Sequence, residues 1–306
     1  LAYLAHSMLF VNNLAINGTD EQRERYLPKT CSGEWVAGMC MSEPNAGTDV
    51  LGMKTTARRE GDEYVLDGAK MWITNGALDD ETLGDIFLVY ARMHGAGRNE
   101  ITQFLVPKGT PGFAIGQRLK GKLGMRASGT AELVFDGARV PARLRVGPEG
   151  SAMLHMMQNL EIERLTLAAM SLGIARRAVE IMNGYAQERM SFGQPLNRFG
   201  QIQRHIAESY AEYMAGRSYV YQVANALRLD KPGNRLDSDG VKLYCSTMAK
   251  HVADRAIQVL GGYGYMGEYH VERLWRDAKL LEIGGGTIEA HQKNITRDLA
   301  RMPQLK

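Results

Sequence analysis

Residues 153–191 have the sequence MLHMMQNLEIERLTLAAMSLGIARRAVEIMNGYAQERMS. Apolar side chains recur there mostly three, four or seven positions apart, which places them on one face of a helix. These positions are Met156, Leu160, Leu165, Leu172, Val179 and Met182. Similar spacing predicts helices over 201–229, 237–260 and 287–299, the last with Thr287 as its N-cap. Four long helices joined by short links that contain Gly or Pro are typical of a four-helix bundle.

The pattern differs between Glu34 and Pro141, where short apolar runs alternate with turn signals. The runs are 35–41, 64–66, 71–74, 86–90, 101–106, 113–115 and 132–135. Turn signals at 60–62, 67–68, 111–112 and 136–137 predict antiparallel hairpins. Because no long helical segment intervenes, the pattern favours a small sandwich or barrel over a parallel sheet with crossover helices.

The first 29 residues predict two short helices, the second beginning after Thr19. The expected fold class is therefore α+β, with N-terminal helices at 1–33, a middle antiparallel β domain at 34–146 and a C-terminal four-helix bundle at 147–306. A length of 306 residues suits such a multi-part chain.

Composition narrows the classes of partner. Lys and Arg number 37 against 34 Asp and Glu, and the charges are scattered, so we expect no nucleic-acid partner. No apolar run reaches transmembrane length, so no membrane partner is expected. Cys31, Cys40 and Cys245 form no CxxC pair, which argues against a disulfide framework and a cysteine-based metal site and favours a reducing compartment.

Two segments of the β region offer ligand-binding chemistry. Residues 42–49 combine hydroxyl and amide donors with Pro and Gly, which suits an anionic or carbonyl-rich ligand or, alternatively, a capped surface turn. Residues 72–76 offer an aromatic face and a hydroxyl at a strand end, the alternative being core packing.

Acidic residues interrupt the apolar face of the first bundle helix at Glu161-Ile162-Glu163-Arg164. One of the two carboxylates must lie near the buried edge, where a raised pKa would suit a general base. The alternative is a solvated pair tied to Arg164.

Three glycine-containing or helix-terminal segments also have two interpretations. Arg189 suits a pyrophosphate or a helix dipole. Residues 281–287 suit an anion or carbonyl oxygen at a helix N-terminus, or a flexible linker. Residues 262–267 match the nicotinamide motif GxGxxG but follow a helical pattern rather than a strand, so a helix end followed by a glycine-containing turn is the favoured interpretation.

Six motifs occur in an order that resembles the acyl-CoA dehydrogenase family over essentially the whole chain, closest to its isovaleryl-CoA dehydrogenase group. They are MSEPNAGTD at 41–49, KMWITNG at 70–76, LGMRAS at 123–128, RMSFGQPL at 189–196, QVLGGYGY at 258–265 and EIGGGT at 282–287. The resemblance implies an FAD cofactor, an acyl-CoA substrate, a homotetramer and an electron-transferring flavoprotein as electron acceptor. It implies no metal, and a location in the bacterial cytoplasm or, in a eukaryote, the mitochondrial matrix. It also implies that this sequence enters late in the family's N-terminal helical domain.

The resemblance assigns cofactor contacts in both halves of the chain. In the β domain, Met41 and Ser42 would contact the pyrimidine side of the flavin, Trp72 would pack over its ring, and Thr74 would hydrogen-bond near N5. The full expected set is Met41, Ser42, Gly47, Thr48, Trp72, Ile73, Thr74, Arg189, Phe192, Gln201, Gln258, Val259, Gly261, Gly262, Thr287 and Glu289. Residues 258–262 would come from a neighbouring subunit, and the family's usual glutamine position holds Gly200, beside Gln201.

Substrate contacts are expected at Thr48, Glu161, Arg164, Gly285 and Gly286. Most members of the family have their catalytic glutamate directly before the final Gly-Thr, where this chain has Gly285. The isovaleryl and long-chain groups place it instead in a Glu-Arg-Leu context on the first bundle helix, and 163–165 match that context.

The resemblance therefore implies that Glu163 removes the α-proton of a saturated acyl-CoA. The β-hydrogen would leave as hydride to the flavin, and the Gly285 N–H would bind the thioester carbonyl. Small residues at 284 and 285 would leave room for a branched acyl group. The alternatives are longer or terpenoid acyl-CoAs, an oxidase or desaturase, and a flavin-bearing binding protein of this fold.

Overall fold

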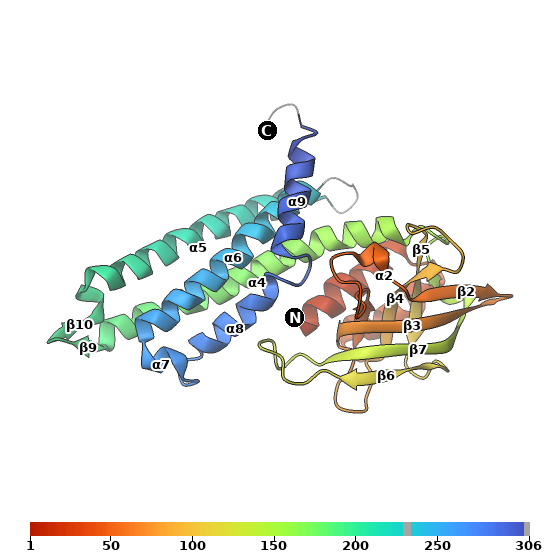
Figure 1. Cartoon of the computed structure of the whole chain (residues 1–306), viewed down its shortest axis with the longest axis horizontal. Helices are drawn as coiled ribbons and strands as arrows, with labels where there is room; N and C mark the ends of the chain where they lie inside the picture. The colour runs from red at the N-terminus through yellow and green to blue at the C-terminus, as the bar shows by residue number, and fades with distance from the viewer. Residues whose placement is uncertain (229–233, 303–306) are drawn as a thin grey trace. The chain divides into compact units, whose positions relative to one another are not determined.

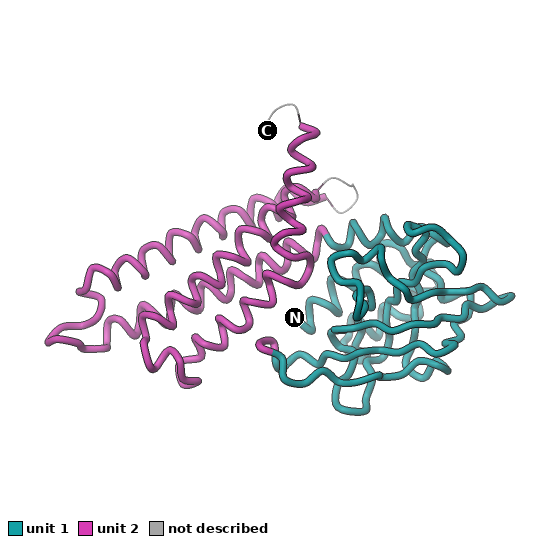
Figure 2. Tube along the Cα trace, viewed as in Figure 1, with its two compact units in different colours: residues 1–122, 126–160 teal, residues 123–125, 161–306 magenta. Residues whose placement is uncertain are grey.

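The structure is a computed structural model that describes residues 1–228 and 234–302. It consists of two compact units (Figure 2): residues 1–122 with 126–160 form unit 1, and residues 123–125 with those from 161 onward form unit 2. Unit 1 contains both the predicted N-terminal helices and the β region, and the units change inside a helix at residue 160. The domain boundaries expected at 33/34 and 146/147 stay a prediction.

Unit 1 begins with helices, as predicted. α1 (Ala2–Leu4), the π-helical η1 (Ala5–Val11) and α2 (Asn12–Asn17) are continuous, and α3 (Asp20–Ser32) follows. Thr19 caps α3, because its hydroxyl accepts a hydrogen bond from Gln22 N while the Gln22 side chain accepts one from Thr19 N. This reciprocal pair is a capping box, which fixes the start of the helix.

Eight strands of unit 1 form one mixed sheet (Figure 1). They are β1 (Ala37–Cys40), β2 (Thr56–Glu60), β3 (Glu63–Thr74), β4 (Ile86–Met93), β5 (Ile101–Pro107), β6 (Phe113–Arg118), β7 (Thr130–Pro141) and β8 (Arg145–Val146). Their order is β6-β7-β3-β2-β4-β5-β8, with β1 paired to β4. Most neighbours are antiparallel, and the predicted turn at 60–62 joins β2 to β3. However, β1 and β2 run parallel to β4, so the sheet is mixed rather than wholly antiparallel, and its strand path ends at β6 and β8.

Two predicted turns are wrong, because Asp67-Gly68 and Asp136-Gly137 lie inside β3 and β7. These strands pair with each other, and their register shifts at this point, which marks a β-bulge. The Gly137 N–H donates to Asp67 Oδ1 (2.8 Å). A Cβ atom on Gly68, whose φ is 142°, would lie 2.7 Å from Thr55 Cα. The glycine is therefore needed for close backbone approach within the sheet.

Unit 2 is helical. Its elements are α4 (Ala152–Glu188, in unit 2 from residue 161), β9 (Met190–Ser191), β10 (Gln194–Pro195), η4 (Leu196–Arg198), α5 (Gly200–Ala226), α6 (Arg235–Leu260), α7 (Gly262–Tyr265), α8 (Val271–Leu281) and α9 (Ile288–Leu299). The helices predicted at 153–191, 201–229, 237–260 and 287–299 are present as α4, α5, α6 and α9, although residue 229 lies outside the described part.

Helix α8 was not predicted, and it corrects the composition of the bundle. In Figure 1, α4, α5, α6 and α8 run side by side, while α9 crosses them. Val271, Leu274, Ala278 and Leu281 of α8 are buried, at the three- and four-residue spacing of a helix. The signal was therefore present directly after the glycine-rich segment. None of the described helices is long and apolar enough to cross a membrane.

Candidate active site

A buried ion pair fixes the backbone that follows β1. The ammonium of Lys70 is fully buried and donates to Glu43 Oε1 (2.9 Å) and to Met41 O (3.1 Å). The Glu43 carboxylate also accepts hydrogen bonds from Lys54 N (2.6 Å) and Thr55 N (3.0 Å). Burial acts to raise the pKa of Glu43, but Lys70 and these donors bring it below its ordinary value. Sequence reasoning missed this pair, whose only signal is a lysine inside a strand.

A bulge in β3 turns Trp72 outward. The pairing of β3 with β7 changes register between Lys70 and Ile73, and Trp72 has a φ of 60°. The indole is 56% exposed, which excludes the alternative of core packing for Trp72. Bulges re-aim side chains, and strained backbone concentrates at functional sites. Ile73 is buried and Thr74 is half-buried at the end of the strand.

The expected flavin contacts of unit 1 have a donor set that fits an isoalloxazine ring. Trp72 supplies an exposed aromatic face, and Ser42 and Thr74 supply half-buried hydroxyls. Thr48 is exposed beside Gly47 and follows closely after Met41 and Glu43, which the buried Lys70 ammonium binds. A planar ring with a polar edge needs this combination of an aromatic surface and hydrogen-bond donors.

In unit 2, Glu163 of α4 faces inward and is only 9% exposed. Burial raises the pKa of Glu163 to about 7, although Arg164 and Lys242 act in the opposite direction. The Arg164 guanidinium pairs with Asp239 Oδ1 (2.9 Å), so the alternative of a solvated Glu163–Arg164 pair is excluded. A carboxyl group whose pKa lies near the working pH is suited to general base catalysis.

The second acidic residue of this segment, Glu161, is also buried. Its Oε2 atom accepts a hydrogen bond from Asn234 Nδ2 (3.2 Å). Burial raises the pKa of Glu161, and the hydrogen bonds from Asn234 counteract that effect. Both carboxyl groups are thus withdrawn from water and both have cationic neighbours, but Glu161 also accepts a hydrogen bond from an amide.

The Gly285–Gly286 turn lies directly beside Glu163. The φ values are 66° and 101°, and a Cβ atom on Gly285 would lie 2.3 Å from Leu167 Cδ1 and 3.4 Å from Glu163 Cδ. Glycine is therefore required at 285. The room for a branched acyl group expected beside Gly285 is filled by Leu167 and Glu163, whereas a Cβ on Gly284 would meet nothing closer than 3.6 Å.

Helix α9 begins where predicted, because the Thr287 hydroxyl accepts a hydrogen bond from Ala290 N (3.2 Å). Glu289 is exposed in the first turn. Hydrogen bonds from its own backbone N–H and from the Thr287 side chain lower the pKa of Glu289. This helix start therefore concentrates hydrogen-bond donors near an acidic side chain, as is common at helix N-termini.

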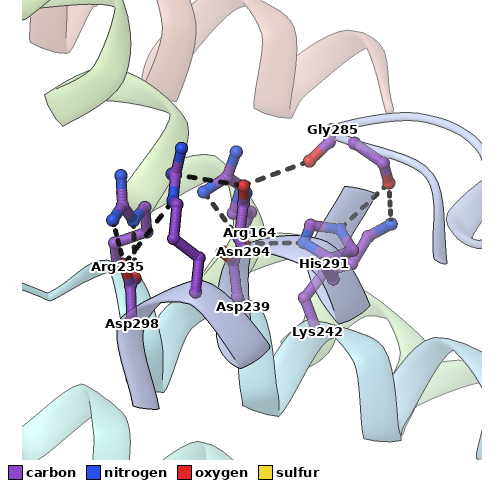
Figure 3. Close-up of polar contacts among 10 residues, drawn as sticks. Arg164, Arg235, Asp239, Lys242, Gly285, His291, Asn294 and Asp298 are labelled. Carbon is purple, nitrogen blue, oxygen red and sulfur yellow. Dashed lines mark hydrogen bonds and ion pairs between the residues drawn. The ribbon is translucent and has the colours of Figure 1, made fainter. Parts of the chain in front are cut away.

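A buried polar network holds the carbonyl groups of the turn (Figure 3). Arg164 Nε donates to Gly285 O (3.4 Å), while Gly286 O accepts from Lys242 Nζ (2.6 Å) and contacts His291 Nε2 (3.0 Å). His291 Nδ1 lies 2.7 Å from the same Asp239 oxygen that binds Arg164. These contacts exclude the flexible-linker interpretation of 281–287.

Sequence reasoning missed Asp239, Lys242 and His291. Their only signal is the spacing of Asp239 and Lys242 on one helical face, three residues apart. His291 comes from α9, on the far side of the turn, and nothing in the sequence connects it to α6.

The expected pyrophosphate and adenosine contacts gather at another end of unit 2. The Arg189 guanidinium lies over the Tyr263 ring (5.9 Å to its centroid), which brings the β9–β10 hairpin next to α7, as Figure 1 also shows. Phe192, at the hairpin tip, has a φ of 48° and is 95% exposed. Gln258, Gly261 and Gly262 are exposed, whereas Val259 is buried, and Gln201 is exposed in the first turn of α5.

This group lies away from α9 within the same chain (Figure 1). The arrangement separates the expected cofactor contacts of unit 2 into two places, and their assignment to two subunits stays a prediction. Within the described residues, no group of three or more His, Cys, Asp or Glu side chains could hold a metal ion.

The fold thus combines a helical unit that holds a buried glutamate of raised pKa with a β unit that presents an exposed aromatic and polar surface. The family models that match are the N-terminal domain (residues 1–34), the middle domain (38–138) and the C-terminal domain (153–300) of acyl-CoA dehydrogenase. The chain belongs to the acyl-CoA dehydrogenase family, which is a family of flavoprotein oxidoreductases.

Named relatives agree with this membership. The mitochondrial isovaleryl-CoA dehydrogenase of Oryza sativa subsp. japonica is 44% identical over 98% of this chain and 72% of the relative. A solved structure described as the electron transferring flavoprotein of Acidaminococcus fermentans has a TM-score of 0.93 at 33% identity, covering 98% of this chain and 78% of that one. A glutaryl-CoA dehydrogenase of Mycobacterium smegmatis in complex with FADH2 has a TM-score of 0.89 at 29% identity, covering 99% and 75%.

Proposed function

We propose that this chain catalyses the α,β-dehydrogenation of an acyl-CoA thioester to a trans-2-enoyl-CoA, with Glu163 as the base. The observation that carries the proposal is the burial of Glu163 beside the Gly285 turn, where its pKa is raised to about 7. A base of this kind is half ionised at neutral pH and can accept a proton from a weak carbon acid.

Removal of the α-proton requires a base and a hydrogen-bond donor to the thioester carbonyl. The α-proton of a thioester is only weakly acidic, so the carbonyl oxygen needs hydrogen-bond donors while charge develops on it. We assign one donor to the Gly285 N–H, which has no partner within the described residues. The ionised Glu163 then accepts the α-proton, and its burial keeps water away from the carboxylate. FAD, when bound, supplies the acceptor for the hydride that leaves the β-carbon.

FAD is proposed as the cofactor because the donor set of unit 1 suits a flavin and because a similar structure is a complex with FADH2. Met41, Ser42, Gly47, Thr48, Trp72, Ile73 and Thr74 would hold the ring. Thr287 and Glu289 would complete the site. Arg189, Phe192, Gln201 and residues 258–262 would hold the pyrophosphate and adenosine across subunits of a homotetramer, because they lie away from α9 within one chain.

We further propose a short branched acyl-CoA of the isovaleryl kind as the substrate, with Thr48, Glu161, Arg164, Gly285 and Gly286 at its site. The name of the Oryza relative supports this choice, and beside the turn only Gly284 leaves room, since a Cβ atom there would meet nothing closer than 3.6 Å. An electron-transferring flavoprotein is proposed as the electron acceptor, which the similar structure from Acidaminococcus supports. A bacterial cytoplasmic or eukaryotic matrix location goes with this function.

The test is an anaerobic visible spectrum of the FAD-loaded protein mixed with isovaleryl-CoA, with octanoyl-CoA in a parallel cell. Bleaching of the flavin by isovaleryl-CoA alone supports both the reaction and the substrate. Bleaching by octanoyl-CoA alone shifts the proposal to longer acyl chains. A flavin that neither substrate bleaches argues for a flavin-bearing binding protein.

Glu163→Gln tests the base in the same assay. We expect it to retain flavin and to lose reduction by at least about a hundredfold, the usual contribution of a general base. The matched control is Glu180→Gln, because Glu180 is an exposed glutamate of the same helix that pairs with Arg176. If Glu163→Gln bleaches at the parental rate, Glu163 is not the base.

A further inference from the structure

Lys242 is a buried cation without a carboxylate contact. Its side chain is fully inaccessible, and its Nζ atom donates to a backbone carbonyl, Gly286 O, at 2.6 Å. Among the described residues, Lys242 forms no ion pair within 4 Å, although Asp239 lies one turn away on the same helix and pairs with Arg164. A buried ammonium group without a counter-ion is costly, so its retention calls for a reason.

The charges around Lys242 come from every element that packs there. Glu163 and Arg164 belong to α4, Asp239 to α6 itself, Glu282 to the end of α8, and His291 to α9. Burial lowers the pKa of Lys242 to about 8, and Glu163 is the group that most strongly opposes this effect by charge attraction. The other two carboxylates have closer partners: Asp239 pairs with Arg164, and Glu282 with Lys279 (2.6 Å).

Besides acting on Glu163 by its charge, Lys242 holds the turn through its hydrogen bond to Gly286 O. Gly286 O accepts both the Lys242 ammonium and the His291 ring, and the neighbouring Gly285 O accepts Arg164. These three side chains come from three different helices, α6, α9 and α4 (Figure 3). Hydrogen bonds to the two carbonyl oxygens thus fix the turn whose Gly285 N–H is assigned to the thioester carbonyl.

We infer that Lys242 is a positioning residue for the proposed reaction, which tethers the Gly285–Gly286 turn through Gly286 O and keeps Glu163 ionised through its positive charge. The inference rests on the proposed role of Glu163. Lys242 needs no contact with the substrate for either effect. The tether keeps the carbonyl-binding N–H in place while charge develops on the thioester, which is when a fixed donor is most effective.

Two substitutions separate the charge from the tether. Lys242→Met removes both, whereas Lys242→Gln removes the charge but keeps an N–H donor that can reach a carbonyl. The matched control is Lys250→Met, two turns along the same helix. Lys250 forms only a long ion pair with Glu282 (4.0 Å) and has no hydrogen bond to Gly285 O or Gly286 O.

The first readout is the protonation midpoint of Glu163 in the FAD-loaded protein. Infrared difference spectra recorded against pH show the C=O stretch of the protonated carboxyl group, and the same spectra of Glu163→Gln identify its band. Removing a nearby positive charge makes ionisation harder, so we expect the midpoint to rise by about one pH unit in both Lys242 variants and not in Lys250→Met. An unchanged midpoint in both Lys242 variants overturns the electrostatic role.

The second readout is the rate of flavin reduction by acyl-CoA at pH 7 and pH 9. A one-unit rise leaves about a tenth instead of half of Glu163 ionised at pH 7, so the loss at pH 7 should exceed that at pH 9 about fivefold. A merely structural defect would lower both rates by the same factor. At pH 9 Lys242 itself is mostly neutral, so Lys242→Gln should approach the parental rate while Lys242→Met stays slower. Equal rates for the two variants at pH 9 overturn the tether.

These measurements distinguish failure of the proposed function from failure of the inference about Lys242. If Glu163→Gln reduces flavin normally, Glu163 is not the base, yet the infrared midpoint still tests whether Lys242 controls its ionisation. If the midpoint does not move while Glu163→Gln is inactive, the base assignment stands and the inference about Lys242 is wrong.

Discussion

Glu163→Gln should stabilise the folded protein at high pH, even as it abolishes turnover. In the folded state burial raises the pKa of Glu163 to about 7, against an ordinary value of 4.5 for the exposed side chain of the unfolded chain. Between these two values the unfolded state loses its proton first, so the native carboxyl group weakens the fold increasingly as pH rises from 4.5 to 7. Above pH 7 the penalty is constant.

The size of the effect follows from the two pKa values. Each pKa unit corresponds to about 1.4 kcal/mol. Buried Glu163 therefore lowers the free energy of unfolding by about 3 kcal/mol at pH 8, where the penalty is complete, and by about 1 kcal/mol at pH 5. Glutamine does not titrate and has a similar shape. We therefore expect the free energy of unfolding of Glu163→Gln, relative to the parent, to increase by about 2 kcal/mol from pH 5 to pH 8.

Urea unfolding of the FAD-loaded protein without substrate, at pH 5 and pH 8, measures this difference. Glu180→Gln is the control, because the Arg176 side chain lowers the pKa of Glu180 and the exposed group should give a small change of opposite sign. A relative stability of Glu163→Gln that is the same at both pH values would refute the raised pKa, and with it the reason for choosing Glu163 as the base.

Three further substitutions test the supports of the site. Lys70→Met leaves the Glu43 carboxylate buried without its counter-charge, so the free energy of unfolding should fall by about 3–5 kcal/mol, and an unchanged urea midpoint would contradict the buried pair. Gly285→Ala places a Cβ against Leu167 at a φ of 66°, which should cost about 2–4 kcal/mol by the same measurement, and a neutral result would show that the turn can move. Thr287→Ala removes the N-cap of α9 and should cost about 1 kcal/mol, seen as a lower thermal midpoint by circular dichroism, with Thr287→Ser close to parental.

Helix positions were predictable where apolar spacing is long and uninterrupted. The spacing in 153–191 predicts α4, and Thr287 correctly predicts the start of α9. The prediction failed at α8, which is short and follows a glycine-rich segment. It also failed at Asp67-Gly68, because that dipeptide is as typical of a turn as of a bulge, and only the approach of Thr55 distinguishes them.

The buried carboxyl group could be predicted, but its neighbours could not. Glu161 and Glu163 interrupt an apolar helical face, which indicates that one of them lies at the buried edge, and the Glu-Arg-Leu context of the family resemblance selects Glu163. Its neighbours are different, because Lys242 and His291 are distant in sequence and meet only where α6 and α9 pack around the turn. The same holds for Glu43 and Lys70, which are 27 residues apart. Contacts of this kind are set by tertiary packing, and a single sequence does not show them.

A base of this kind has to satisfy two opposing requirements. Burial makes the carboxylate of Glu163 a stronger base, but burial alone would leave the group protonated at neutral pH. Positive charge restores ionisation, but a direct ion pair would occupy the oxygen atoms that must accept the proton. In this molecule the Arg164 guanidinium pairs with Asp239, and the Lys242 ammonium donates to Gly286 O, rather than to the Glu163 carboxylate. Both cations therefore act on Glu163 through space while its carboxylate stays available, and the same hydrogen bonds that hold them in place fix the turn that receives the thioester in the proposed reaction.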